Sequence, residues 1–165
     1  MRKTKGFTLI ELLVVISIIG LLTTLAVVAL NSARQKARDA KRVADIKQIQ
    51  TALELFYNDQ SGYPAETGAG RVLGSATYRC LDENGFAGGP CSGDTMYMGL
   101  IPANPTPNGA DYTYNCLQDD GTTECTSAAN ASKYSLTFTI ESATGSLTSP
   151  NCTANQEGIT CAGTF

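Results

Sequence analysis

The feature that most constrains this chain is an apolar run near its start. From Phe7 to Leu30 there are 24 residues, and Glu11 is the only charged one among them. As a helix this run would be about 36 Å long, enough to cross the ~30 Å hydrocarbon core of a bilayer. An ordinary secretory signal has an apolar region of only about 7–15 residues. We therefore expect a membrane-spanning helix at 7–30, with a signal peptide cut near Asn31 or a plain single-pass anchor as the alternatives.

Basic residues lie on both sides of this run. Arg2, Lys3 and Lys5 precede it, and the positive-inside tendency would keep that end in the cytoplasm. A second basic cluster, from Arg34 to Arg42, follows the run and competes with that assignment, since it could instead meet anionic headgroups at the far face. Both readings of the second cluster stay open at this point.

The segment from Lys5 to Glu11, with the sequence KGFTLIE, resembles the leader-cleavage motif of type IV prepilins and of the pseudopilins of type II secretion. In that family a membrane-embedded aspartyl peptidase, the prepilin peptidase, cuts after the glycine and methylates the new N-terminal phenylalanine. The resemblance implies a leader of residues 1–6, cleavage between Gly6 and Phe7, and N-methylation of Phe7.

Glu11 stands out because a carboxylate within lipid costs up to roughly 3 kcal/mol at mid-span. Cleavage would create a cationic amine on Phe7, one helical turn from the Glu11 carboxylate. The resemblance implies that Glu11 pairs with the amine of a neighbouring subunit and sets the register of assembly. Pairing with the amine of its own chain, or a simple preference for the positive end of the helix dipole, are the alternatives.

A second, amphipathic segment follows the apolar run. Between residues 31 and 57 apolar side chains recur at three- and four-residue steps, which predicts one buried face. They are Val43, Ile46, Leu53 and Phe56 or Tyr57. If both segments form one helix, it covers about 51 residues and ~76 Å, more than a small domain can wrap. We expect the apolar half to protrude and the stem, residues 31–57, to pack on a head.

The head is expected to begin at residue 58, where the turn formers of 58–64 end the helix. Residues 65–107 read as a long loop region with one short strand near 96–101. Strands are predicted at 111–116 and 134–141, and the second alternates a face of Tyr134, Leu136, Phe138 and Ile140 with a polar face. A turn at 143–145 leads to 146–148 and predicts a hairpin. The simplest head is an antiparallel sheet of three or four strands, an α+β arrangement.

Six cysteines all lie from residue 80 onward, and none forms the C-x-x-C spacing of zinc or redox sites. An even number after a membrane-targeting segment suggests disulfides formed in an oxidising space. Six cysteines allow fifteen connectivities, and sequential pairing closes the shortest loops with the least loss of entropy. That pairing joins Cys80 with Cys91, Cys116 with Cys125, and Cys152 with Cys161.

Charge and composition exclude several functions. Up to Gln50 nine basic residues face three acidic ones, and from Thr51 onward three basic residues face twelve acidic ones. A head this acidic predicts no direct nucleic-acid site, because phosphate contacts need basic side chains. The lack of histidine removes the commonest general base and metal ligand. We expect no enzyme activity and no catalytic residue.

The stretch from Met96 to Tyr114 is similar in layout to the loop before the last strands of major pseudopilins, which often binds calcium. The family's tryptophan and flanking acid are missing here. Calcium needs six to eight oxygen ligands. We therefore expect no cofactor, and Asp111, Asp119 and Asp120 are the candidates should calcium bind.

The resemblance also implies the pilin fold, a long N-terminal helix packed on a small antiparallel β-sheet head. It implies these parts: leader 1–6, transmembrane and filament-core helix 7–30, amphipathic stem helix 31–57, and disulfide-stabilised head 58–165. The implied partners are further copies of the chain in a helical homopolymer, the prepilin peptidase, the inner-membrane assembly machinery, and the membrane before assembly.

The expected function is that of a structural subunit of a type IV pilus-like extracellular filament for adhesion, motility or DNA uptake. The precursor would be stored in the cytoplasmic membrane and the filament displayed on the cell surface. Three disulfides suit such an exposed fibre, which places this reading first. A pseudopilin of a type II secretion system is the alternative. A membrane-anchored extracellular binding domain is a third hypothesis, against which the leader motif argues.

Overall fold

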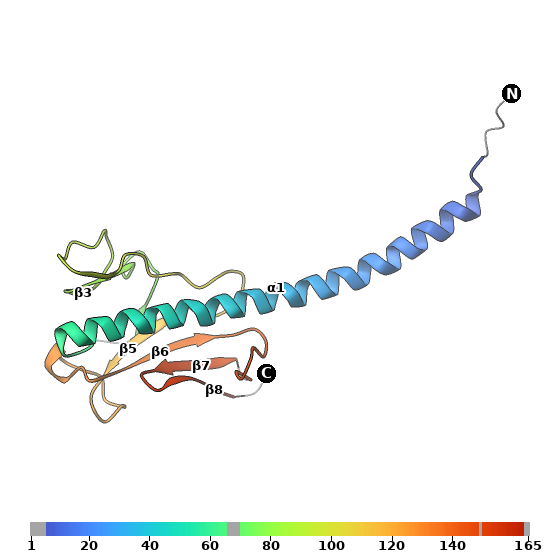
Figure 1. Cartoon of the computed structure of the whole chain (residues 1–165). Coiled ribbons are helices and arrows are strands. Elements are labelled where there is room, and N and C mark those ends of the chain that lie inside the picture. The colour runs from blue at the N-terminus through green and yellow to red at the C-terminus, as the bar shows by residue number, and fades with distance from the viewer. Residues whose placement is uncertain (1–5, 66–69, 149, 164–165) are drawn as a thin grey trace. The chain divides into compact units, whose positions relative to one another are not determined.

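The computed structural model describes residues 6–65, 70–148 and 150–163, so residues 1–5 of the predicted leader lie outside it (Figure 1). The chain divides into two compact units, Met1–Gln35 and Lys36–Phe165. A single helix of 52 residues, α1 (Leu9–Gln60), belongs to both units. The described strands are β1 (Arg71–Val72), β2 (Cys80–Asp82), β3 (Gly85–Ala87), β4 (Met96–Met98), β5 (Thr113–Leu117), β6 (Lys133–Thr139), β7 (Asn151–Asn155) and β8 (Gly158–Ala162). A short 3-10 helix, η1 (Ala128–Asn130), precedes β6.

The length of α1 follows from its sequence. It contains no proline, and Gly20 is its one glycine, so nothing in it strongly opposes helix formation. The helix ends at Gln60, three residues beyond the expected end at residue 57, because Ser61 adopts a left-handed conformation with a φ of 58°. The Ser61 N–H donates to the Tyr57 carbonyl over 2.8 Å, which is the hydrogen bond of an αL helix cap.

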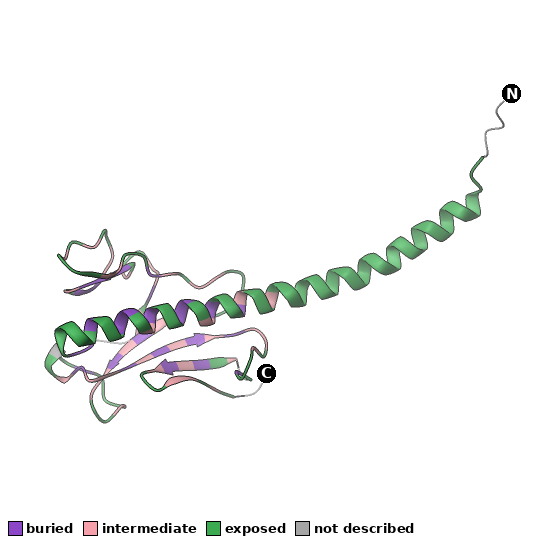
Figure 2. Ribbon diagram, in the orientation of Figure 1, coloured by how far each residue is buried: buried purple, intermediate pink, exposed green. Residues whose placement is uncertain are grey.

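In the first unit no described residue covers the apolar part of α1. Every residue from Gly6 to Arg34 is exposed, including the whole apolar run (Figure 2). By length and composition α1 is long and apolar enough to cross a membrane. An exposed apolar face of this extent needs lipid or other protein to cover it, since soluble monomers rarely expose contiguous apolar patches larger than a few hundred Å².

The second unit contains two antiparallel sheets that share one core with the C-terminal part of α1. The larger sheet has five strands in the order β1-β5-β6-β7-β8, and the smaller has three in the order β3-β2-β4. Aromatic contacts tie the layers together: Phe86 of β3 packs edge-on against Tyr114 of β5 at 4.9 Å between ring centroids. Phe56 of α1 meets Tyr97 of β4 at 5.3 Å. The predicted α+β pilin-like arrangement is confirmed.

Several predicted elements are present as expected. The stem stripe is buried at Ile46, Leu53 and Phe56, whereas Val43 is half-buried and Tyr57 is exposed. The two predicted strands correspond to β5 and β6. The apolar face predicted for the second one is buried at all four positions, which are Tyr134, Leu136, Phe138 and Ile140.

Two expectations about the head are wrong. The supposed loop region of 65–107 contains β1, β2 and β3 besides the expected β4, because strands of two or three residues are too short to show a period. The predicted hairpin at 143–148 is reduced to an isolated bridge between Thr144 and Leu147. The strand that follows β6 and pairs with it is β7, whose buried face carries only Cys152 and Ala154, and small side chains of this kind give little hydrophobic signal. The larger sheet therefore has five strands rather than three or four.

Candidate functional site

The start of α1 is closed by a reciprocal pair of hydrogen bonds between Thr8 and Glu11. The Thr8 backbone N–H donates to Oε2 of Glu11 over 2.8 Å, and the Thr8 hydroxyl donates to the same oxygen over 2.7 Å. In return the Glu11 N–H donates to the Thr8 hydroxyl oxygen over 3.3 Å. This is a capping box, in which a residue before the helix and one in its first turn satisfy each other's backbone donors.

The capping box places Glu11 beside the predicted cleavage point. Gly6 and Phe7 are exposed and lie immediately before Thr8, so the bond between them is accessible in the described chain. Glu11 thus has a local role in capping its own helix, close to the dipole alternative considered above. Its role in assembly register stays a prediction. Sequence reasoning missed Thr8, although the T-x-x-E spacing is the signal of a capping box.

The other polar residues of the apolar run have hydroxyls that bond within the same helix. Ser17 donates to the carbonyls of Leu13 and Val14, both over 2.9 Å. Thr23 donates to Ile19 over 2.7 Å and Thr24 to Leu21 over 2.8 Å. Back-bonding of this kind removes the penalty of placing a hydroxyl in an apolar surrounding. The run from Leu12 to Leu30 therefore presents an effectively apolar surface.

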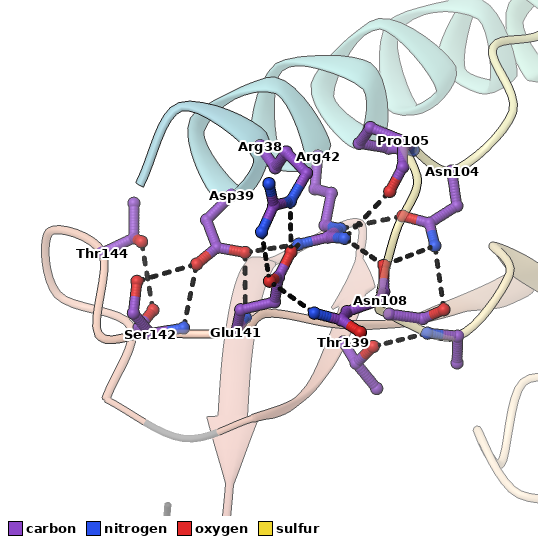
Figure 3. Close-up of polar contacts among 12 residues, drawn as sticks. Arg38, Asp39, Arg42, Asn104, Pro105, Asn108, Thr139, Glu141, Ser142 and Thr144 are labelled. Carbon is purple, nitrogen blue, oxygen red and sulfur yellow. Dashed lines mark hydrogen bonds and ion pairs between the residues drawn. The ribbon is translucent and has the colours of Figure 1, made fainter. Parts of the chain in front are cut away.

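The second unit contains a buried cluster of charges where α1 meets the end of β6 (Figure 3). Arg38 donates two parallel hydrogen bonds to the Glu141 carboxylate, from Nε to Oε1 over 2.7 Å and from Nη2 to Oε2 over 2.6 Å. Asp39 receives the N–H groups of Glu141 and Ser142 over 2.9 Å each. The hydrogen bonds from Arg38 are the main reason that the pKa of Glu141 falls to about 2.

Arg42 is the centre of this cluster and is fully buried. A guanidinium has five N–H donors, and all five are used here. Two of them meet carboxylates and three meet oxygens of the loop that follows β4. The acceptors are Oδ1 of Asp39 at 2.6 Å, Oε1 of Glu141 at 2.7 Å, Oδ1 of Asn104 at 2.8 Å, and the carbonyl oxygens of Pro105 at 3.0 Å and of Asn108. We call Arg42 and these five acceptors the Arg42 cage.

One sequence-based reading placed the basic residues 34–42 against anionic headgroups, and the other treated them as a competing positive-inside signal. For Arg42 the headgroup reading is wrong, since it lies inside the second unit. A signal was present in the spacing: the steps of three and four residues that place Ile46, Ile49 and Leu53 on the buried stripe continue backwards to Arg42 and Asp39. Because these two positions carry charges, the apolar pattern did not reveal that the buried stripe extends about two turns before Ile46.

The cysteines of the head form three disulfides. They join Cys80 to Cys91, Cys116 to Cys125, and Cys152 to Cys161, with Cα–Cα distances of 6.0, 5.4 and 4.0 Å. The third bond links directly paired residues of β7 and β8. Each bond closes a short segment of the chain, so together they tie the smaller sheet, the loop after β5, and the outermost strand pair.

The structure does not bring the calcium candidates together. Asp111 precedes β5, whereas Asp119 and Asp120 follow it, so a strand of five residues separates them. Oδ1 of Asp120 accepts the backbone N–H groups of Thr122 and Thr123 within its own turn. Those bonds and the Thr123 hydroxyl hold the pKa of Asp120 well below its usual range. Within residues 6–65, 70–148 and 150–163 no group of three or more metal-binding side chains of the His, Cys, Asp or Glu type gathers.

Comparisons with known proteins extend the resemblance from the motif to the head. The family model described as "Prokaryotic N-terminal methylation motif" matches residues 1–27. Type II secretion system core protein G of Vibrio cholerae is 34% identical over 122 residues, covering 74% of this chain and 77% of the relative. The proteins of that name from Klebsiella pneumoniae and Escherichia coli are 33% and 35% identical, covering 68% and 64% of this chain and 74% and 69% of theirs.

No solved structure matches significantly. The similar proteins favour the alternative expectation, the secretion-system subunit, over the pilus subunit that stood first, because the relatives just described carry the same secretion-system name. The similarity to the Vibrio cholerae protein extends over about three quarters of both chains and therefore well beyond the N-terminal motif. This chain belongs to the type II secretion system core protein G family.

Proposed function

We propose that this chain is a pseudopilin, a structural subunit that is stored in the cytoplasmic membrane and polymerises into the short filament of a type II protein secretion system. The observation that carries the proposal is the combination of a head related to core protein G with a fully exposed apolar helix. The helix does not suffice alone, because a single apolar helix near the N-terminus is also found in plain membrane anchors. The head does not suffice alone either, because a head domain without an exposed apolar helix has no means of entering a membrane or a filament core.

Storage in the membrane is supported by the surface of the first unit. The exposed run from Leu12 to Leu30 has no charged residue, and its hydroxyls bond to its own backbone. Such a segment is stable in lipid. It is equally stable among identical segments, since helices in an apolar bundle associate through packing. The proposed partners are therefore the membrane first and other copies of the chain afterwards.

Processing is proposed to occur between Gly6 and Phe7 by a prepilin peptidase. The new amine would belong to Phe7, next to Thr8, whose N–H and hydroxyl already converge on Oε2 of Glu11. A cationic amine arriving beside this carboxylate would compensate its charge in lipid. We propose that Glu11 exchanges its capping bonds for the amine of a neighbouring subunit during assembly, which fixes the vertical register.

The proposal is tested in the native host after deletion of the gene, by complementation with the wild-type chain or with Gly6→Val. A Cβ at Gly6 would meet nothing within 4 Å, so the substitution leaves the described fold intact. It changes the residue that the peptidase has to accommodate just before the cut. Gly20→Ala is the matched control, because a Cβ at Gly20 also meets nothing within 4 Å. Mass spectrometry of the N-terminus and export of secreted enzymes are measured for each.

Wild type and Gly20→Ala are expected to show a methylated Phe7 as the first residue and to restore export. Gly6→Val is expected to retain its leader and fail to restore export. Full export by the uncleaved form would contradict the proposal. Normal export in the deletion strain together with loss of long surface fibres would instead support the pilus reading.

A further inference from the structure

The loop from Asn104 to Gly109 is held against α1 by one side chain. Oxygens of Asn104, Pro105 and Asn108 all accept hydrogen bonds from the Arg42 guanidinium (Figure 3). The amide of Asn104 closes the loop from within by donating to the Gly109 carbonyl over 3.0 Å. The loop therefore presents its oxygens inward, toward a positive charge, as loops around bound cations do.

The charges of the Arg42 cage are balanced once Arg38, the second partner of Glu141, is included. Arg42 and Arg38 carry two positive charges, and Asp39 and Glu141 carry two negative ones. Asp39 is fixed further by the Ser142 hydroxyl over 2.9 Å, and Glu141 by the Asn108 amide over 3.1 Å. Buried ions persist when their remaining bonding capacity is satisfied, and this condition is met here.

The residues do not fit the calcium ion that the family resemblance implies for the stretch from Met96 to Tyr114. Three oxygens of this loop, from Asn104, Pro105 and Asn108, already receive the guanidinium hydrogens, and a divalent ion among them would lie beside a fixed positive charge. Gly109 leaves no extra room, since a Cβ there would come within 2.8 Å of Nη2 of Arg42. The acidic candidates Asp111 and Asp120 lie at opposite ends of β5.

We propose that Arg42 acts as an internal cation that replaces calcium in shaping the 104–109 loop, so that this subunit keeps the loop folded without a metal ion. The proposal concerns the fold of one chain and does not rest on the proposed function. It distinguishes this protein from any relative whose loop depends on a dissociable ion, because a covalently attached guanidinium cannot be lost by dilution or chelation.

The test uses the full chain in detergent micelles and follows hydrogen exchange of residues 103–110 by mass spectrometry, in EDTA and in excess calcium chloride. Wild type is expected to show the same protection in both. Arg42→Ala is expected to exchange roughly tenfold faster or more in this segment, because bonds to a charged donor are stronger than neutral ones. Arg38→Ala is the matched control, since Arg38 bonds to Glu141 and not to the loop.

Near-UV circular dichroism of the buried tyrosines shows whether each variant is folded. Should Arg42→Ala not fold, Arg42→Lys serves the same comparison, because lysine keeps the charge and loses the planar fork. Loss of protection or of thermal stability of wild type in EDTA would overturn the proposal. So would equal exchange of the 103–110 segment in the Arg42 and Arg38 variants.

Discussion

The hydroxyl of Tyr112 donates a hydrogen bond to Oδ2 of Asp45 over 3.0 Å, and both side chains are buried. Burial raises the pKa of Asp45, although Tyr112 and Lys41 pull it back. A raised carboxyl pKa favours the folded state at low pH, and this contribution is lost as the pH rises through the folded pKa. At neutral pH the burial of the ionised Asp45 therefore lowers the free energy of unfolding.

Asp45→Asn is accordingly expected to leave stability at pH 7 unchanged or to raise it by up to about 1 kcal/mol, since an amide oxygen still accepts from Tyr112. Asp39→Asn, on the same helix, is expected to destabilise by about 2 kcal/mol or more, because Asp39 is the partner of buried Arg42. Thermal unfolding of the full chain in detergent, followed by near-UV circular dichroism, measures both. A reversed order would show that the two carboxylates have been assigned the wrong roles.

Acid should weaken the second unit through Glu141. Its pKa lies at about 2 against an ordinary 4.5, so its ionised form stabilises the fold above about pH 4.5 and this stability is lost as the pH falls toward 2. The loss from this group is on the order of 3 kcal/mol. Glu141→Gln is expected to start less stable at neutral pH and to lose less on acidification. Glu157→Gln, at an exposed position, is the control and should follow the wild-type profile.

Ser61→Gly is expected to stabilise the chain. Ser61 has a φ of 58°, a conformation that glycine adopts without the penalty of a Cβ. The expected gain is about 0.5–1 kcal/mol, with the greater freedom of glycine in the unfolded chain offsetting part of it. The comparison is made by thermal unfolding against Ser127→Gly, at an exposed position outside the helix cap, which should give no gain. Destabilisation by Ser61→Gly would mean that the serine side chain contributes more than its backbone strain costs.

Glu11→Gln separates helix capping from assembly. Glutamine keeps the acceptor for the two Thr8 donors, so the capping box survives, whereas the negative charge is lost. We expect normal leader cleavage, measured by mass spectrometry of the N-terminus, and at least tenfold less recovery in sheared or cross-linked filaments. Thr8→Val is the complementary variant, because it removes the hydroxyl and leaves the charge. Wild-type recovery of Glu11→Gln in filaments would exclude a role for the charge in register.

Much of the fold could be predicted because its signals are local. The alternation of Tyr134, Leu136, Phe138 and Ile140 identifies β6, and the apolar run identifies the exposed half of α1. The pair β7 and β8 could not be predicted in the same way. The buried positions of β7 are the small residues Cys152 and Ala154, and in β8 Ile159 and Cys161 are only partly buried against the core. The burial of β7 depends on pairing with β6, which is a non-local effect, and β8 pairs in turn with β7.

The residues of the candidate site also divide into those with a local sequence signal and those placed by distant parts of the chain. Gly6, Phe7 and Glu11 stand out through spacing alone, and Thr8 could have been added from its distance to Glu11. Arg42 continues the three- and four-residue spacing of the buried stripe, but its charge outweighs that signal, because a charged residue in a basic stem normally lies in water. Four of its five acceptors come from a loop some 62 to 66 residues away and from Glu141 at 99 residues, and only Asp39 is a neighbour in the sequence, so most of its surroundings exist only after folding.

The hydroxyls of Ser17, Thr23 and Thr24 have a consequence for how a subunit leaves the bilayer. Since each is bonded to a carbonyl of its own helix, these hydroxyls would hold no polar contact that has to break when the helix moves out of lipid. Under the proposed function, Glu11 would then be the residue of the run from Phe7 to Leu30 whose charge distinguishes one height from another. A subunit of this kind would rise stepwise during assembly, with the charge of Glu11 setting where each step stops.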